Sequence, residues 1–416
     1  MILEKVLIYA GLLLLTAAAP YWSMLAFVVF SPWNALNDLI GWDPRLPWSF
    51  FLALRACLEG WKSKRFRFPP LAIWSFCAFV LVAGIGLVFE TERVLPGEVV
   101  SAAFLFLYFL AGAFASYSIV KLTHGDKRLK WLAVAAACSI VCASAVGLLQ
   151  AASSYFTGEA TARIPGTLGN PNYFAAYLSI GVATIVLLFR LRMLPRAVCI
   201  PVCVIAVLTC LFTLSRMGTV ACLLGITLAL LIRPEGRLVD LRLLAALGVM
   251  GAVSIVLAVG YFAQVRRSLT FSSDANQAEV ASIVQEAEDL SRLEAVQFAW
   301  KTWEEHPIFG VGVNTLAARN LKATGIYATT HDTCMQILAG TGIAGFLLMS
   351  TLVMSLIRKI PRPNRRYLLP FFVVLCLCSF FGDYMQSIEI LVMFAILFAL
   401  LQRDGGGSQQ SGLVYS

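Results

Sequence analysis

The sequence predicts an all-α, polytopic integral membrane protein with about 12 transmembrane helices and one long loop outside the membrane that contains an amphipathic helix. Composition is the first observation, since 59% of the 416 residues are apolar, 13% are charged and the mean hydropathy is +0.81. A soluble core uses less apolar surface than this. The second observation is that the apolar residues fall into separate runs of roughly 16 to 25 residues, long enough to cross a bilayer as helices.

The expected spans follow one another along the chain. They lie near 4–19, 22–58 (one crossing plus irregular sequence), 70–89, 98–120, 131–153, 171–189, 195–214, 216–232, 241–263, 333–357, 367–384 and 387–402. Prolines and Asp43-Pro44-Arg45 interrupt the first two, so one long and one short crossing would also fit. The expected domains are therefore helices over 1–263, a long loop over 264–332, helices over 333–402 and a flexible Gly/Ser/Gln-rich tail over 403–416.

Lys and Arg indicate which connections face the cytoplasm. Alternate connections carry them densely: Lys62, Lys64, Arg65 and Arg67; Lys121, Lys127, Arg128 and Lys130; Arg190, Arg192 and Arg196; Arg233, Arg237 and Arg242; Arg358, Lys359, Arg362, Arg365 and Arg366. By the positive-inside rule this side is cytoplasmic, and we expect both termini there and no cleavable signal peptide. Anchoring to anionic lipid then accounts for most of the net charge of +9 without nucleic acid.

Cysteine and histidine indicate neither a disulfide framework nor a metal site. Nearly all of the 11 Cys lie inside expected spans and none lies in 264–332, which is typical of small apolar core residues. The three His are scattered, and the sequence contains no His-Glu-x-x-His, Cys-x-x-Cys or Asp-x-Asp pattern. We expect a protein that uses no metal and no cofactor.

Two short outward segments combine turn residues with Arg. Arg163-Ile-Pro-Gly-Thr-Leu-Gly-Asn-Pro-Asn172 predicts a tight turn at a helix start, and capping of that helix is the alternative to a binding role. Leu214-Ser-Arg216-Met-Gly218 places Arg216 at or just within the membrane surface. A guanidinium at that depth is costly unless it pairs with an anion, so we expect an anionic ligand; snorkelling to water is the alternative.

The long loop over 264–332 contains the expected amphipathic helix. Ser291-Arg292-Leu293-Glu294 has the form of a capping box, and the helix ends at His306-Pro307. Its apolar face comprises Leu293, Val296, Trp300 and Trp303, which suits the membrane interface. Arg292 opposes the helix dipole in the first turn but would suit a bound phosphate; an ordinary solvated Arg is the alternative.

His331 stands at the end of the same loop, just before the span that starts near Thr333. A nearby helix N-terminus disfavours imidazolium, so a neutral imidazole that can accept a proton is expected. That is what a general base requires. A capping or interfacial role is the alternative.

In these motifs the chain resembles the O-antigen ligase and polymerase family of membrane glycosyltransferases. The marks are Gly166-Thr-Leu-Gly-Asn-Pro-Asn172, Ser215-Arg216-Met-Gly218, His306-Pro-Ile-Phe-Gly310-Val-Gly312, and His331 followed by Gly342 in His331-Asp-Thr-Cys-Met-Gln-Ile-Leu-Ala-Gly-Thr-Gly342. Their order around one long outward loop, and the absence of a large C-terminal soluble domain, look most like the O-antigen ligase branch.

The resemblance implies a bacterial inner-membrane enzyme of lipopolysaccharide biosynthesis with its active site facing the periplasm. The implied donor is a glycan on undecaprenyl diphosphate and the implied acceptor is lipid A-core, with inversion at the anomeric carbon and no required protein partner. His331 would deprotonate the acceptor hydroxyl, and Arg216 and Arg292 would hold the diphosphate. Arg163, Asn172 and Asp383 are weaker candidates for the same pocket.

Other acceptors and another class of protein remain as alternatives. An O-antigen or exopolysaccharide polymerase, or a protein O-oligosaccharyltransferase, would share the donor. A transporter of lipid-linked glycan would instead carry ionisable residues in mid-span and paired broken helices. Charges here concentrate in loops and at span ends, and the sequence shows no internal repeat.

Overall fold

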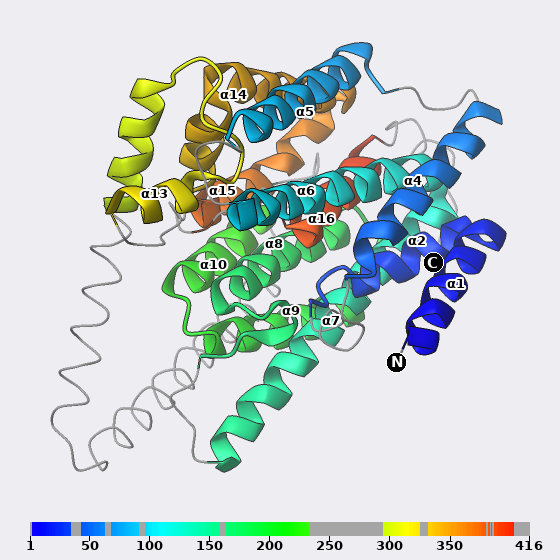
Figure 1. The fold of residues 1–416 in the computed structure, drawn as a ribbon. Helices are drawn as coiled ribbons and strands as arrows, with labels where there is room; N and C mark the ends of the chain where they lie inside the picture. Colours follow the sequence, from blue (N-terminus) through cyan, green and yellow to red (C-terminus); the bar gives the residue numbers. More distant parts are fainter. Residues whose placement is uncertain are drawn as a thin grey trace, which may run out of the picture.

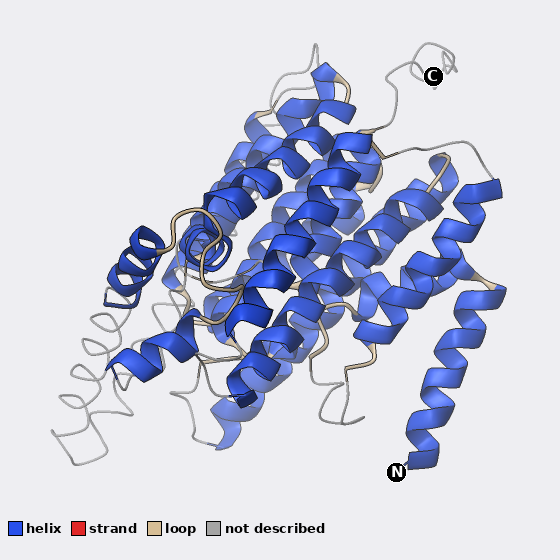
Figure 2. Ribbon diagram, turned by 45° about the horizontal axis from the view of Figure 1, so that its top comes forward, coloured by secondary structure: helices blue, strands red, loops and turns tan. Residues whose placement is uncertain are grey.

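The computed structural model describes residues 2–34, 43–62, 68–90, 96–157, 163–232, 294–324, 332–379, 382, 384 and 387–402. Secondary structure in these ranges is entirely helical, without a strand (Figure 2). The expected span 241–263, most of the loop 264–332 and the tail 403–416 lie outside the described residues.

From residue 70 onward, a described helix overlaps each expected span other than 241–263 (Figure 1). They are α1 (Ile2–Ala18), α2 (Pro20–Phe30), α4 (Arg45–Lys62), α5 (Pro70–Glu90), α6 (Pro96–Leu122), α7 (Asp126–Thr157), α8 (Pro171–Arg190), α9 (Arg196–Phe212), α10 (Arg216–Leu231), 294–305, α13 (Leu316–Thr324), α14 (Thr333–Lys359), α15 (Leu368–Ser379) and α16 (Ile388–Leu401). Within this part of the chain, five helices are long and apolar enough to cross a membrane: α5, α6, α7, α8 and α14. The structure therefore supports a polytopic membrane protein.

Helix α8 forms the centre of the bundle. Its side chains from Phe174 to Leu188 are buried without interruption, and it packs against α7, α9, α10, α15 and α16. A helix that is apolar around its whole circumference needs protein or lipid on every side, and for α8 the neighbouring helices supply most of that cover. The start of α8 is consequently held in place by neighbours on several sides.

At one end of the bundle, arginines donate hydrogen bonds to carbonyl groups at helix C-termini. Arg128 donates from Nη1 to the carbonyl oxygen of Leu122, the last residue of α6, at 3.0 Å. Arg365 donates from Nε to Ile360, just past α14, at 3.0 Å, and Arg190 bonds to the residue that follows α10. Cations at helix C-termini satisfy the last carbonyl groups and the helix dipoles. We call this the basic end, and the opposite end, where α8, α10 and α14 begin, the motif end.

Residues 22–58 differ from the expected single crossing, because they contribute two helices. Tyr21 beside the start of α2 donates its hydroxyl to the carbonyl of Arg128 at the basic end, at 2.7 Å. Just past α2, Asn34 donates its backbone N–H to Thr167 at the motif end, at 2.9 Å. Helix α4 starts beside this point and returns along α6. Proline at the first position of α2 lacks an N–H that would have no helical partner anyway, so it starts this helix rather than breaking it.

The cysteines are not all core residues. Cys199, Cys203, Cys210, Cys222 and Cys378 are buried, whereas Cys57, Cys77, Cys138, Cys334 and Cys376 lie on exposed helix faces. All eleven are free thiols. In a membrane protein an apolar outer face contacts lipid, so small thiols are tolerated on it as well as in the core.

Candidate functional site

The segment before α8 forms the expected tight turn. A 3-10 turn spans Gly166–Leu168, and Gly169 follows with φ of +72°. Asn170 caps α8, since its side-chain oxygen accepts the backbone N–H groups of Asn172 at 2.9 Å and Tyr173 at 3.3 Å. Asn170 therefore performs the capping that the sequence left open for Asn172.

Arg163 connects this segment to the turn between α9 and α10. Its Nη2 donates to Oδ1 of Asn172 at 2.6 Å, and its Nε donates to the carbonyl oxygen of Thr213 at 3.3 Å. Two of the weaker site candidates, Arg163 and Asn172, are thus in direct contact. The exposed guanidinium stands between the starts of α8 and α10.

The turn itself fixes where α10 begins. Leu214 has φ of +54°, a left-handed conformation that costs a residue with a side chain roughly 1–2 kcal/mol. Ser215 then caps α10 by accepting the N–H of Gly218 at 3.3 Å. Arg216 is the first residue of α10, so its backbone lies at the motif end; its side chain is outside the described part of the structure.

The start of α14 lies at the same place. Asp332 caps this helix by accepting the N–H of Met335 at 2.9 Å. Thr333 donates its hydroxyl to Gly382 at 2.9 Å and accepts the N–H of Tyr384 at 3.0 Å. These bonds join the start of α14 to the connection between α15 and α16.

Tyr384 completes the link back to α8. Its ring packs edge-on against Tyr173, with centroids 5.0 Å apart, and its hydroxyl lies 3.5 Å from the carbonyl oxygen of Asn172. Segments around residues 163–172, 213–216, 332–333 and 384 therefore meet at the motif end, although they are far apart in the sequence.

Helix α14 is broken inside the bundle. Gly342 has φ of +64° and ψ of −172°, and the segment 307–312 pairs with the break. Four backbone bonds make this pairing: Val311 N to Ala339 O (3.0 Å), Gly312 N to Gly340 O (2.8 Å), Ile343 N to Pro307 O (2.9 Å) and Ala344 N to Ile308 O (3.1 Å). Unwound backbone in a membrane helix requires such partners, because lipid offers none. The pairing therefore holds the first turns of α14 as a separate short helix.

Glycines permit this close pairing of backbones. A Cβ on Gly342 would lie 2.2 Å from the carbonyl oxygen of Ile308, and one on Gly310, at φ of +66°, would lie 2.5 Å from the carbonyl carbon of Gly340. On the other side, a Cβ on Gly86 of α5 would lie 2.9 Å from the Cα of Gly312. The two ends of the His-x10-Gly pattern thus differ in position: Gly342 breaks α14, and His331 immediately precedes Asp332, the residue that caps the first part of α14.

The helix over 294–305 packs against the segment 307–312 that pairs with the break in α14. Ala295, Ala299 and Thr302 form its buried face, and Ala299 packs with Val311, Leu316 and Ala339. Of the expected apolar face, Trp300 is 48% exposed and donates to Glu304 at 2.7 Å, whereas Trp303 is half-buried beside the same cluster. Small residues face the protein here because the segment 307–312 and α14 lie too close to this helix to admit an indole ring.

The geometry of the motif end suits an anion. The N-termini of α8, α10 and α14 bring the positive ends of three helix dipoles to the motif end. Arg163 contributes a full positive charge between two of them. Helix N-termini with an adjacent guanidinium are a recurrent arrangement for phosphate groups.

The remaining candidates are placed only through their neighbours. His331, Arg292 and Asp383 lie outside the described residues, while Asp332 and Tyr384 beside two of them are at the motif end. Sequence reasoning missed Tyr173, Thr333 and Tyr384. The signal for Tyr384 was weak, namely an aromatic residue beside an acidic one at a span end.

Among the residues that the structure describes, no three His, Cys, Asp or Glu side chains cluster closely enough to hold a metal ion.

The fold defines a polytopic helical membrane protein whose described motifs meet at one end of the bundle. Residues 201–350 match the sequence profile of the O-antigen ligase family. This region includes the Ser215 cap, the loop over 307–312 and the break in α14. The match supports a place in that family and an enzyme of the O-antigen ligase or polymerase type. A search of curated proteins found no match to the chain.

Proposed function

We propose that the protein is an O-antigen ligase that transfers glycan from undecaprenyl diphosphate to lipid A-core without a metal ion. The observation that carries this proposal is the contact of Arg163 with the starts of α8 and α10, which Tyr384 and Thr333 link to the start of α14 at the motif end. A diphosphate ester is the ligand that such a site would stabilise, and its negative charge grows as the glycosidic bond breaks. The family match over 201–350 supports the same chemistry.

The proposed reaction is a single displacement with inversion. The acceptor hydroxyl oxygen forms a bond to the anomeric carbon while His331 takes the hydroxyl proton. The bond from that carbon to the diphosphate oxygen breaks, and its electron pair leaves with undecaprenyl diphosphate. Arg216 and Arg292 neutralise the leaving group, Arg163 and Asn172 line the same pocket, and Asp383 orients a sugar or the base.

The proposal also fixes an orientation. The basic end faces the cytoplasm by the positive-inside rule, and the motif end faces the periplasm of a bacterial inner membrane. Donor and acceptor are both lipid-linked, so both substrates would reach a site just below the periplasmic surface of the inner membrane from within the bilayer.

The test is complementation in a strain that lacks its own ligase and supplies a compatible donor and core. The wild type should restore laddered lipopolysaccharide, and His331→Ala should lower transfer by about 10²- to 10⁴-fold at matched membrane levels. His124→Ala is the matched control, because this histidine lies in the connection between α6 and α7 at the basic end. Full activity of His331→Ala would exclude the general-base role.

The acceptor is tested separately. Purified protein is given lipid-linked glycan together with lipid A-core, with a second glycan chain, or with a pilin-like protein. Product on lipid A-core alone supports ligation, whereas longer lipid-linked chains or a modified protein would replace it with polymerisation or protein glycosylation. Turnover in detergent, where no second compartment exists, argues against transport.

A further inference from the structure

An ion pair is buried between α2 and α4 in a part of the chain outside the family match. The side chains of Arg45 and Asp43 are 3% and 2% exposed, and Arg45 Nη2 lies 2.5 Å from Oδ2 of Asp43. Nε of Arg45 donates to both carboxylate oxygens at 2.9 Å. Glu389 in the first turn of α16 is also buried and interacts electrostatically with Arg45.

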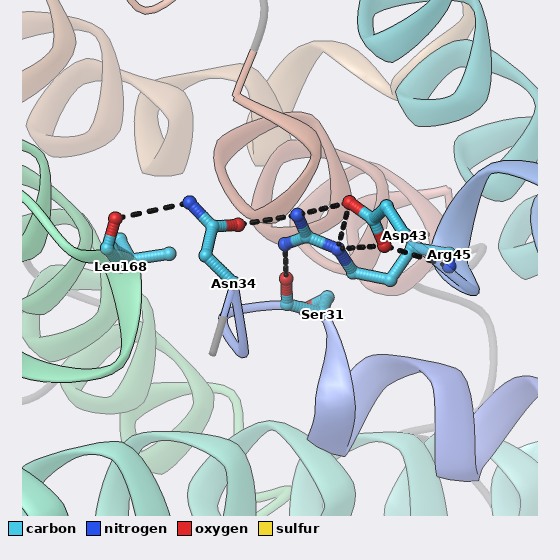
Figure 3. Close-up of polar contacts among 5 residues, drawn as sticks. All are labelled: Ser31, Asn34, Asp43, Arg45 and Leu168. Carbon is cyan, nitrogen blue, oxygen red and sulfur yellow. Dashed lines mark hydrogen bonds and ion pairs between the residues drawn. The ribbon is translucent and has the colours of Figure 1, made fainter. Parts of the chain in front are cut away.

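The guanidinium of Arg45 also donates hydrogen bonds to the connection that follows α2 (Figure 3). Nη1 donates to the carbonyl oxygen of Ser31 at 2.7 Å, and Nη2 donates to Oδ1 of Asn34. A planar fork can serve three acceptors in fixed directions, which an ammonium cannot do. Arg45 therefore sets the orientation of the Asn34 side chain.

Asn34 passes this orientation on to the turn before α8. Its Nδ2 donates to the carbonyl of Leu168 at 3.0 Å (Figure 3). Its backbone N–H donates to the carbonyl oxygen of Thr167 at 2.9 Å. From the opposite side, Gln150 of α7 accepts the N–H of Gly166 at 2.9 Å and donates to its carbonyl at 3.3 Å. The 3-10 turn is thus clamped between α7 and the connection after α2.

We propose that Arg45 is a positioning residue for the anion site, acting through Asn34 on the turn Gly166–Leu168. The cap Asn170 and Asn172 follow this turn directly, and Arg163, which contacts Asn172, precedes it, so the position of the turn sets the start of α8. The link to donor binding rests on the proposed function, whereas the claim that Arg45 fixes the turn Gly166–Leu168 through Asn34 does not.

Energetics favour a specific role over general stability. Burying two charges costs several kcal/mol per ion, and replacing a buried ion pair by apolar residues is often neutral or stabilising. Charged groups at membrane depth are retained mainly where function requires them. The Asp43–Arg45 pair is best explained by the fixed directions of its hydrogen bonds, which apolar packing could not supply.

The experiment compares Asn34→Ala and Arg45→Lys with Thr184→Ala in purified full-length protein. Thr184 is the matched control because it is fully buried in the same α8, bonds to Ile180 at 2.9 Å, and lies far from the turn. Amide hydrogen exchange of the peptide covering 163–175 should rise about tenfold in both test variants, because a buried bond to the turn is lost, and stay unchanged in the control.

Steady-state transfer provides the second readout. The KM for the lipid-diphosphate donor should rise about tenfold in the test variants, while kcat stays within about twofold, because a displaced anion site weakens binding of the donor. Unchanged exchange at 163–175 in Asn34→Ala, or an equal rise in Thr184→Ala, would overturn the inference. A wild type without transfer activity would overturn the proposed function alone, because the exchange measurement needs no substrate.

Discussion

Replacing Gly342 with alanine should separate the two parts of α14. At φ of +64° and ψ of −172° the backbone occupies a region that is essentially restricted to glycine. A Cβ would also lie 2.2 Å from the carbonyl oxygen and 2.3 Å from the carbonyl carbon of Ile308, and neither backbone atom can rotate away. The segment 307–312 must therefore withdraw from the break.

The magnitude follows from what is lost. The disfavoured conformation costs roughly 1–3 kcal/mol. Withdrawal also breaks the bonds from Ile343 and Ala344 to Pro307 and Ile308, and a buried, unsatisfied backbone group costs about 1–3 kcal/mol. We expect the paired arrangement to lose about 3 kcal/mol or more, which corresponds to a shift of more than a hundredfold in its equilibrium.

The assay measures thermal unfolding and glycan transfer of purified protein. Gly84→Ala on α5 is the matched control, because a Cβ there meets nothing within 4 Å. Alanine in a helix interior should stabilise the control by roughly 0.5–1 kcal/mol, whereas Gly342→Ala should unfold at lower temperature and transfer glycan at least tenfold more slowly. Equal unfolding temperatures and equal rates for the two variants would refute the reasoning.

Three further changes test the motif end. Arg163→Ala should raise the donor KM about tenfold or more in steady-state transfer, since a charge-assisted contact is lost; an unchanged KM would place the donor elsewhere. Ser215→Ala should destabilise the protein by about 1 kcal/mol in thermal unfolding. Ser215→Asp should retain the stability of the wild type, because Ser and Asp side chains can both cap α10. Equal stability of the wild type and both variants would exclude the cap. Tyr384→Phe should transfer glycan almost normally, whereas Tyr384→Ala should be several-fold slower at matched protein levels through loss of the Tyr173 contact, worth about 0.5–1.5 kcal/mol; equal rates would dismiss that contact.

Local features of the site could be predicted because they depend on neighbouring residues. The tight turn before α8 and the end of the helix near His306 follow from Gly, Pro and Asn residues within a few positions of the backbone that they shape. The sequence assigned Trp300 to an apolar face at the membrane interface, and this side chain is exposed on the protein surface. It did not indicate the opposite, protein-facing side of the helix over 294–305, where Ala299 packs beside Val311 and Ala339.

The N-terminal region shows why spans with charges are difficult to assign. Asp43-Pro44-Arg45 lowers the hydropathy between α2 and α4 and gives the impression of irregular sequence within one crossing. In the structure the two charges neutralise each other and bond to the connection after α2, so both helices can pack in the bundle. A window of hydropathy cannot include a pairing that lowers the cost of burial.

The sequence by itself determined the class of protein, the positions of the described helices from α5 onward that lie in expected spans, the basic end and the tight turn that precedes α8. All of these follow from composition and from periodicities within one or two helical turns. Only the tertiary structure decided which segments meet. Arg163 reaches Thr213 across 50 positions, Asn34 reaches Leu168 across 134 and Tyr384 reaches Asn172 across 212. Such contacts depend on how helices pack in three dimensions, and residues this far apart in the chain have no shared period that could indicate them.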